Sequence, residues 1–219
     1  FFIPERPYLD EIIIQITPDP ASIVLGLEDG STHMSATLGG AANIIRLQDN
    51  DDVIVTSDGH EAIGPVQWLE LNVNDPVLSD VRVRQAIAYA VDRNFLADVI
   101  DQGISYPAIT GIDSSSPFSN PDVETYEQDL DAARALLAEA GYSDGDITLT
   151  IDYIPPSQAP YAEYVVQALE DIGINISLNV SPDFPTWAGR VAAGEHQMTI
   201  NNVWNWGDPV IGVHRTYPS

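Results

Sequence analysis

The clearest alternation of apolar and polar positions lies in the second half of the chain. Apolar residues recur at helical spacing over residues 130–140 and again over 161–172, and a glycine follows each stretch. Residues 147–153 and 174–180 instead alternate between apolar and polar side chains, which is typical of half-buried strands. This order predicts a helix, then a strand, a helix and a parallel strand joined by a right-handed crossover.

Weaker patterns predict further elements on either side of this unit. The expected strands are residues 8–16, 53–56, 66–73 and 198–203. The expected helices are residues 20–27 after an Asp19 cap, 41–47, a stretch capped by Ser79 or Asp80 with an apolar face from Val83 to Val91, 94–100 and 187–193. Residues 105–121 form a loop rich in Ser, Pro and Gly that is long enough to carry a function. The chain is therefore predicted to be an α/β protein.

Length and composition narrow the function classes. The chain has 219 residues, 44% of them apolar, so it can bury a core as one large domain or two modest ones. No apolar run approaches the roughly 20 residues of a membrane-spanning helix. The 33 acidic residues outnumber eight basic ones, all Arg, and the net charge of -25 argues against nucleic acid as a partner. Such an acidic, lysine-free composition fits a salty habitat. Cysteine is absent, which excludes disulfides and thiolate chemistry.

Four stretches, met in one order along nearly the whole chain, resemble a known family. They read RPYLDEI over residues 6–12, DVRVRQAIAYAVDR over 80–93, AARALLAEAGY over 132–142 and WNWGDP over 204–209. In these stretches the chain resembles the bacterial extracellular solute-binding proteins of family 5, which include oligopeptide-, dipeptide- and nickel-binding proteins.

The resemblance implies a periplasmic-binding-protein-like fold (type II, cluster C) in which two lobes joined by a hinge enclose a solute. Residues 1–70 are expected to be a remnant of the first lobe and residues 71–219 most of the second α/β lobe, with the rest of the first lobe before Phe1 and after Ser219. The implied function is the substrate-binding component of an ABC importer, which delivers its solute to permease subunits of the inner membrane. The resemblance implies a monomer without enzymatic activity or cofactor, located in the periplasm or held outside the cell by a lipid anchor.

The resemblance also indicates where a ligand would bind. In peptide-binding relatives, an Asp four residues before the Pro of the Trp-containing turn pairs with the ammonium group of the peptide. Here Asn205 stands four residues before Pro209. An amide offers no charge-assisted pair. The expected ligand therefore shifts from a free-amine peptide toward a modified peptide, an opine or an oligosaccharide.

Four neighbouring residues complete the predicted ligand site. Trp204 and Trp206 are expected to stack on a sugar ring or to line an apolar pocket, with a core position for one of them as the alternative. Asp208 is a candidate that fits a turn or a helix start better. Asn202 is a weaker candidate still.

Other polar residues are assigned structural roles. The histidines lack metal-ligand spacing and are expected at the surface or in turns: His33, His60, His196 and His214. The acidic run over residues 49–52 lacks the Gly and the distal Glu of a calcium loop, and a solvated turn is expected there. Three arginines are expected to pair with carboxylates such as Asp80 and Asp92: Arg82, Arg84 and Arg93.

Enzyme motifs are absent from the sequence. It contains no Gly-x-Ser-x-Gly elbow, no phosphate-binding glycine-rich loop and no His-Glu-x-x-His. Two alternatives to solute binding stay open: a carboxylate-dependent hydrolase, and a scaffold that binds no small ligand.

Overall fold

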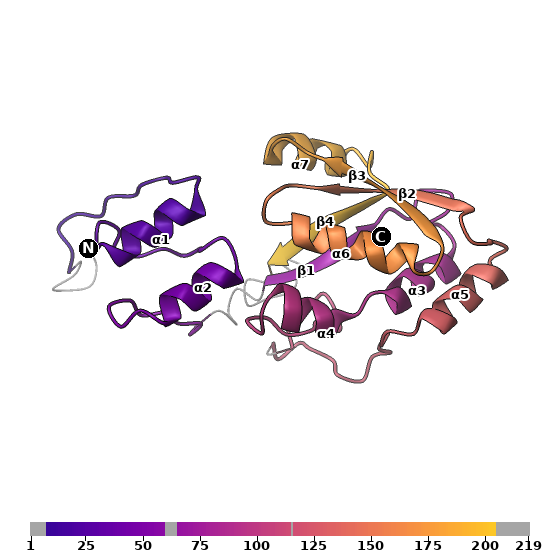
Figure 1. Ribbon diagram of the computed structural model, residues 1–219, viewed down its shortest axis with the longest axis horizontal. Coiled ribbons are helices and arrows are strands. Elements are labelled where there is room, and N and C mark those ends of the chain that lie inside the picture. Colours follow the sequence, from indigo (N-terminus) through magenta and orange to yellow (C-terminus); the bar gives the residue numbers. More distant parts are fainter. Residues whose placement is uncertain (1–7, 60–64, 115, 205–219) are drawn as a thin grey trace. The chain divides into compact units, whose positions relative to one another are not determined.

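The computed structural model describes residues 8–59, 65–114 and 116–204 (Figure 1). The chain divides into two compact units, Phe1–Val55 and Thr56–Ser219. The first strand of the second unit, Pro65–Leu71, crosses the predicted boundary after residue 70 and belongs to the sheet of that unit. The assignment of residues 1–70 and 71–219 to two lobes of a larger protein stays a prediction.

The first unit contains two helices, α1 (Pro20–Glu28) and α2 (Ala41–Gln48), which confirms both predicted helices. The Asp19 carboxylate accepts hydrogen bonds from two backbone N–H groups of the first turn of α1, as an N-cap does. An ion pair of 2.6 Å between Arg46 and Glu28 joins the two helices.

Two strands predicted for the first 56 residues are not formed. Residues 8–16 and 53–56 are extended chain without strand pairing. The side chains of Ile13, Ile14 and Ile16 are 81%, 86% and 90% exposed. A strand requires a hydrogen-bonded neighbour, and the described residues provide none for either segment, so the β-branched composition alone does not produce a sheet.

The second unit is built on one four-stranded sheet. Its strands are β1 (Pro65–Leu71), β2 (Ile147–Tyr153), β3 (Ile174–Val180) and β4 (Met198–Trp204). The spatial order is β1-β4-β2-β3, in which β2 runs parallel to β3 and β4, and β1 runs antiparallel to β4. The predicted parallel pair over residues 147–153 and 174–180 is confirmed, and so are the other two predicted strands of this unit.

The helices of the second unit lie on both faces of the sheet (Figure 1). They are α3 (Val81–Ala90), α4 (Arg93–Phe95), the π-helix η2 (Leu96–Ile100), α5 (Leu130–Glu139), α6 (Ala159–Glu170) and α7 (Phe184–Ala192). The main core joins α3, α5 and α6 to one face of the sheet, where alternate residues of β2 and β4, such as Leu149, Ile151 and Ile200, are buried. Helix α7 buries Trp187 against the opposite face, which carries the polar positions of the same strands. No helix in the described part of the chain is long and apolar enough to cross a membrane.

Candidate functional site

Two of the five predicted ligand residues lie at the end of β4, and the other three lie outside the described residues. Asn202 is exposed and pairs in register with Gln67 of β1, and Trp204 pairs with Pro65. Because the two residues are separated by one position, they lie on the same face of the strand. Asn205, Trp206 and Asp208 fall beyond residue 204. The structure therefore brings Asn202 and Trp204 together at one strand end.

The beginning of β4 is fixed by side-chain amides. The Asn72 amide donates to the carbonyl oxygens of His196 (2.8 Å) and Gly194 (3.1 Å). The Gln197 amide group donates to Asp75 Oδ2 at 2.8 Å and accepts from the Thr150 backbone N–H at 2.9 Å. These bonds tie the start of β4 to both of its neighbouring strands, β1 and β2.

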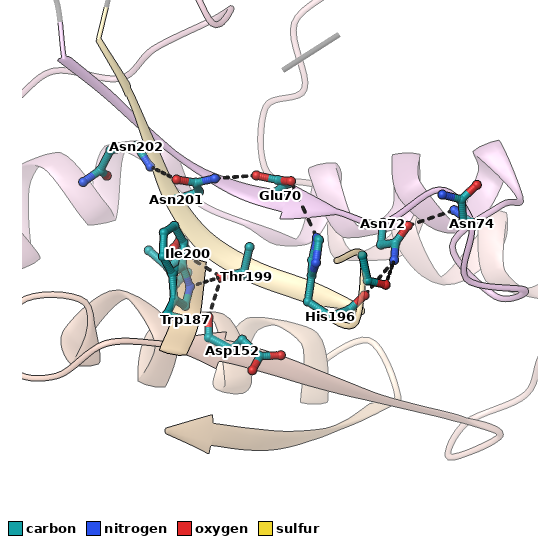
Figure 2. Close-up of polar contacts among 11 residues, drawn as sticks. Glu70, Asn72, Asn74, Asp152, Trp187, His196, Thr199, Ile200, Asn201 and Asn202 are labelled. Carbon is teal, nitrogen blue, oxygen red and sulfur yellow. Dashed lines mark hydrogen bonds and ion pairs between the residues drawn. The ribbon is translucent and has the colours of Figure 1, made fainter. Parts of the chain in front are cut away.

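The middle of β4 is fixed by a buried hydroxyl (Figure 2). Trp187 Nε1 of α7 donates to Thr199 Oγ1 at 2.8 Å, and the same hydroxyl donates to the Asp152 carbonyl at 2.8 Å. Thr199 has no exposed surface. One side chain thus links α7, β4 and β2.

A second polar contact joins α7 to β2. Asp152 is buried, and its Oδ1 atom lies 3.0 Å from Arg190 Nη2 and also accepts from the Asn179 amide of β3. Asp152 Oδ2 makes no hydrogen bond with the described residues. A buried carboxylate requires a compensating charge, and Arg190 supplies it. The Asp152 carboxylate therefore anchors α7 to the sheet.

Further along β4, polar side chains connect Glu70 of β1 to the predicted ligand end (Figure 2). Asn201 Nδ2 donates to Glu70 Oε2 at 2.6 Å, and Asn201 Oδ1 accepts from the Asn202 backbone N–H at 2.7 Å. On the other side of the carboxylate, His196 Nε2 lies 3.6 Å from Glu70 Oε1. The nearby His196 imidazole lowers the pKa of Glu70 below its usual value, burial opposes this effect, and the Asn201 amide adds to it.

Some structural roles assigned from the sequence are wrong. His196 is 7% exposed, not a surface residue, because its imidazole lies against Glu70 of β1. Arg82 does pair with Asp80, at 2.6 Å. Arg84 and Arg93 instead donate to backbone carbonyl groups, since loop carbonyls lie closer to them than any carboxylate in the described residues.

Other predicted features give no site. Residues 49–52 form an exposed turn closed by the Asn50 side chain, as expected. His33 is exposed, as expected, while His60 and His214 lie outside the described residues. Among the described residues, no group of three or more acidic or histidine side chains could hold a metal ion. In the loop over residues 105–121, a hollow of about 180 Å³ is lined by hydroxyl and aliphatic side chains. It is smaller than the roughly 300–1,000 Å³ of most ligand pockets.

Sequence reasoning found the end of β4 but missed the residues that support it. Glu70, Asn201 and Arg190 are single polar residues in otherwise ordinary strand and helix patterns. A polar residue such as Asp152, next to buried positions of a parallel strand, is the one signal that points to a partner on the covering helix.

Comparison with known proteins identifies the family. The model of the bacterial extracellular solute-binding proteins, family 5 (middle region), matches residues 2–217. The chain is 28% identical to the dipeptide-binding protein of Escherichia coli over 93% of this chain and 38% of that protein. It is 25% identical to heme-binding protein A of Haemophilus influenzae over 93% of this chain and 38% of that protein. The chain thus spans less than half the length of these relatives.

Solved structures show the same fold. The periplasmic binding protein DppA from Helicobacter pylori, in complex with the peptide STSA, matches with a TM-score of 0.76 at 24% identity, over 85% of this chain and 35% of that one. NikA from Brucella suis, in complex with Fe(III)-EDTA, matches with a TM-score of 0.69 at 22% identity, over 87% of this chain and 41% of that one. The mixed sheet and its helices therefore form part of a periplasmic-binding-protein-like fold, as predicted, and the chain belongs to the bacterial extracellular solute-binding proteins of family 5.

Proposed function

We propose that the protein containing this chain is the substrate-binding component of an ABC importer, which captures a peptide-like or other small solute and delivers it to a membrane permease. The observation that carries the proposal is the family match over residues 2–217. Relatives named for dipeptide, peptide and heme binding support a solute-binding role over an enzymatic one.

The geometry of β4 supports a ligand site at its carboxyl end. Side-chain hydrogen bonds hold β4 just before its start, in its middle and near its carboxyl end, where Asn202 and Trp204 lie. Ligands of α/β sheets commonly bind beyond the carboxyl ends of parallel strands. Asn205, Trp206 and Asp208 follow directly in the sequence and complete the proposed site.

In this proposal, two lobes close on the solute, and closure is driven by contacts that exist only in the closed state. Residues 1–70 would belong to the first lobe and residues 71–219 to the second. The protein would act as a monomer in the periplasm, or outside the cell with a lipid anchor.

A second candidate ligand class is a non-peptide solute such as an opine or an oligosaccharide. The observation that favours it is Asn205, since an amide cannot form the charge-assisted pair with a peptide ammonium group.

Thermal unfolding of the full-length protein tests both ligand classes. The probes are trialanine, N-acetyl-trialanine, maltotriose and mannopine, each titrated to saturation. A ligand at about 100 times its Kd stabilises the folded state by roughly 2.7 kcal/mol. The proposal expects a raised melting temperature with at least one probe and a smaller effect of trialanine than of N-acetyl-trialanine. If no probe raises the melting temperature but one is chemically converted, an enzyme replaces the binding protein.

A further inference from the structure

Glu70 contacts two side chains that are five residues apart. Its Oε1 atom lies 3.6 Å from the imidazole of His196, two residues before β4, and its Oε2 atom accepts from Asn201 within the strand. Glu70 pairs in register with Thr199, midway between those two contacts. The carboxylate therefore spans the strand that leads to the predicted ligand residues.

The Asn201 side chain is held at both ends of its amide. Its nitrogen donates to Glu70 at 2.6 Å, a short distance that suits a bond to a charged acceptor. Its oxygen accepts from the Asn202 N–H at 2.7 Å. The Glu70 carboxylate on β1 is thereby linked, through the Asn201 side chain, to the backbone N–H of Asn202 on β4.

The backbone N–H of Asn202 makes no hydrogen bond in the ladder between β1 and β4. The Asn72 N–H donates to the Gln197 carbonyl at 2.9 Å, which sets the hydrogen-bonded pairs of this antiparallel ladder. Such pairs alternate along the strands, so Gln197, Thr199 and Asn201 direct their N–H groups toward β1, and Asn202 directs its own away. β2 pairs with the first residues of β4 and ends before this point. No neighbouring strand in the described residues accepts from the Asn202 N–H, and the side-chain oxygen of Asn201 accepts from it instead.

The opposite contact of Glu70 is with a buried imidazole. His196 is 7% exposed, and neither of its ring nitrogens makes a hydrogen bond with the described residues. Its backbone carbonyl accepts from the Asn72 amide. The Glu70 carboxylate therefore has the imidazole near one oxygen and the Asn201 amide on the other.

We propose that Glu70 is a positioning residue for the ligand end of β4: through Asn201 it fixes the Asn202 backbone, and so the direction in which β4 presents Trp204. The ligand part of this inference rests on the proposed function, whereas the positioning of Asn202 does not.

Amide hydrogen exchange, followed by NMR on the full-length protein without ligand, tests the positioning. Glu70→Ala removes the acceptor of Asn201 and should accelerate exchange of the Asn202 N–H about fivefold or more, the factor expected for loss of one hydrogen bond. Glu70→Gln keeps an acceptor oxygen and should restore most of the protection. Asn201→Thr removes this bond and also the oxygen that accepts from the Asn202 N–H, so it should accelerate exchange at least as much as Glu70→Ala.

Glu163→Ala is the matched control, because Glu163 is an exposed carboxylate on α6. It should leave the Asn202 exchange rate unchanged, and in every variant the amides of β2 should keep their protection. Asn202 exchange within twofold of the parent in Glu70→Ala would overturn the positioning role, whatever the result for Asn201→Thr.

Binding of N-acetyl-trialanine, measured by calorimetry on the same variants, tests the consequence for ligand. Weaker binding in Glu70→Ala and recovered binding in Glu70→Gln support the role of Glu70 at the ligand site. Unchanged affinity alongside faster Asn202 exchange would overturn that role. If the parent binds none of the probes, the proposed function fails while the exchange result still decides the positioning.

Discussion

Trp187 and Thr199 are joined by a buried hydrogen bond of 2.8 Å that connects α7 to the centre of the sheet. The threonine hydroxyl in turn donates a hydrogen bond to the Asp152 carbonyl, so it acts as both acceptor and donor. Burial without such partners would be unfavourable for either polar group. Trp187 is the one buried side chain of α7 among the described residues. The bond therefore holds α7 over the strand that leads to the ligand residues.

Thr199→Val should destabilise the second unit, because it preserves volume while leaving the indole N–H unpaired. An unsatisfied buried donor costs about 1–3 kcal/mol. Urea unfolding measures the loss. The control is Thr148→Val, an exposed position on β2 where valine suits a strand and little change is expected. A Thr199→Val variant as stable as the parent would show that the bond contributes nothing.

Arg190→Met should be more damaging than loss of an exposed arginine, because it leaves the buried Asp152 carboxylate without its cation. We expect a cost of about 2–4 kcal/mol, somewhat below that of a fully buried pair because Arg190 is partly exposed. The matched control is Arg134→Met, whose partner Asp131 is exposed and whose loss should cost at most about 1 kcal/mol.

The double variant Asp152→Asn with Arg190→Met isolates the charge effect. Removing the carboxylate's charge should recover part of the stability lost in Arg190→Met, since the isolated buried charge is then gone. A double variant less stable than Arg190→Met would mean that the arginine acts through packing alone.

Glu70 should make the stability depend on pH in the acid range. The pKa of Glu70 is lowered from its ordinary value of 4.5 in the folded protein, mainly by His196. A carboxyl group with a lowered folded-state pKa contributes stability that is complete above its unfolded pKa and is lost as the pH falls through the folded-state pKa. Parent and Glu70→Gln should therefore differ most near pH 7 and converge as the pH falls through the lowered pKa of Glu70. Urea unfolding at pH 7, 5 and 3.5 measures this, and a difference that grows toward acid would contradict the sign.

Asn205→Asp should shift ligand preference toward peptides with a free amine. The substitution introduces the carboxylate that the family resemblance implies for peptide-binding members, and hydrogen bonds to charged groups are worth about 1.5–3 kcal/mol. Affinity for trialanine should rise about tenfold or more relative to N-acetyl-trialanine, as measured by calorimetry. An unchanged ratio would mean that Asn205 does not contact the amino end of a ligand.

The sequence predicted the second unit better than the first for a physical reason. Alternation over residues 147–153 and 174–180 reports burial on one face, and the parallel pair formed as expected because its partner strands are present. Residues 8–16 have the composition of a strand, but composition does not supply a hydrogen-bonding neighbour. Helix N-caps such as Asp129 could be predicted from the sequence because a cap bonds to backbone groups within three residues of itself.

The candidate site was only partly predictable because its supporting contacts are not local. Glu70 and Asn201 are separated by 131 positions, and Asn72 and His196 by 124. A strand pattern gives the face of each residue, but the register of β1 against β4 decides which polar side chains meet. His196 was assigned to the surface for the same reason, since nothing near it in sequence indicates that Glu70 lies beside it.

The central claim, solute capture, is tested most directly by native mass spectrometry of the full-length protein as purified from its own source. We predict a protein with one small molecule bound, released on unfolding and absent from a Trp204→Ala variant that remains folded. A protein that carries no molecule, binds none of the four probes and instead converts one of them would contradict the account.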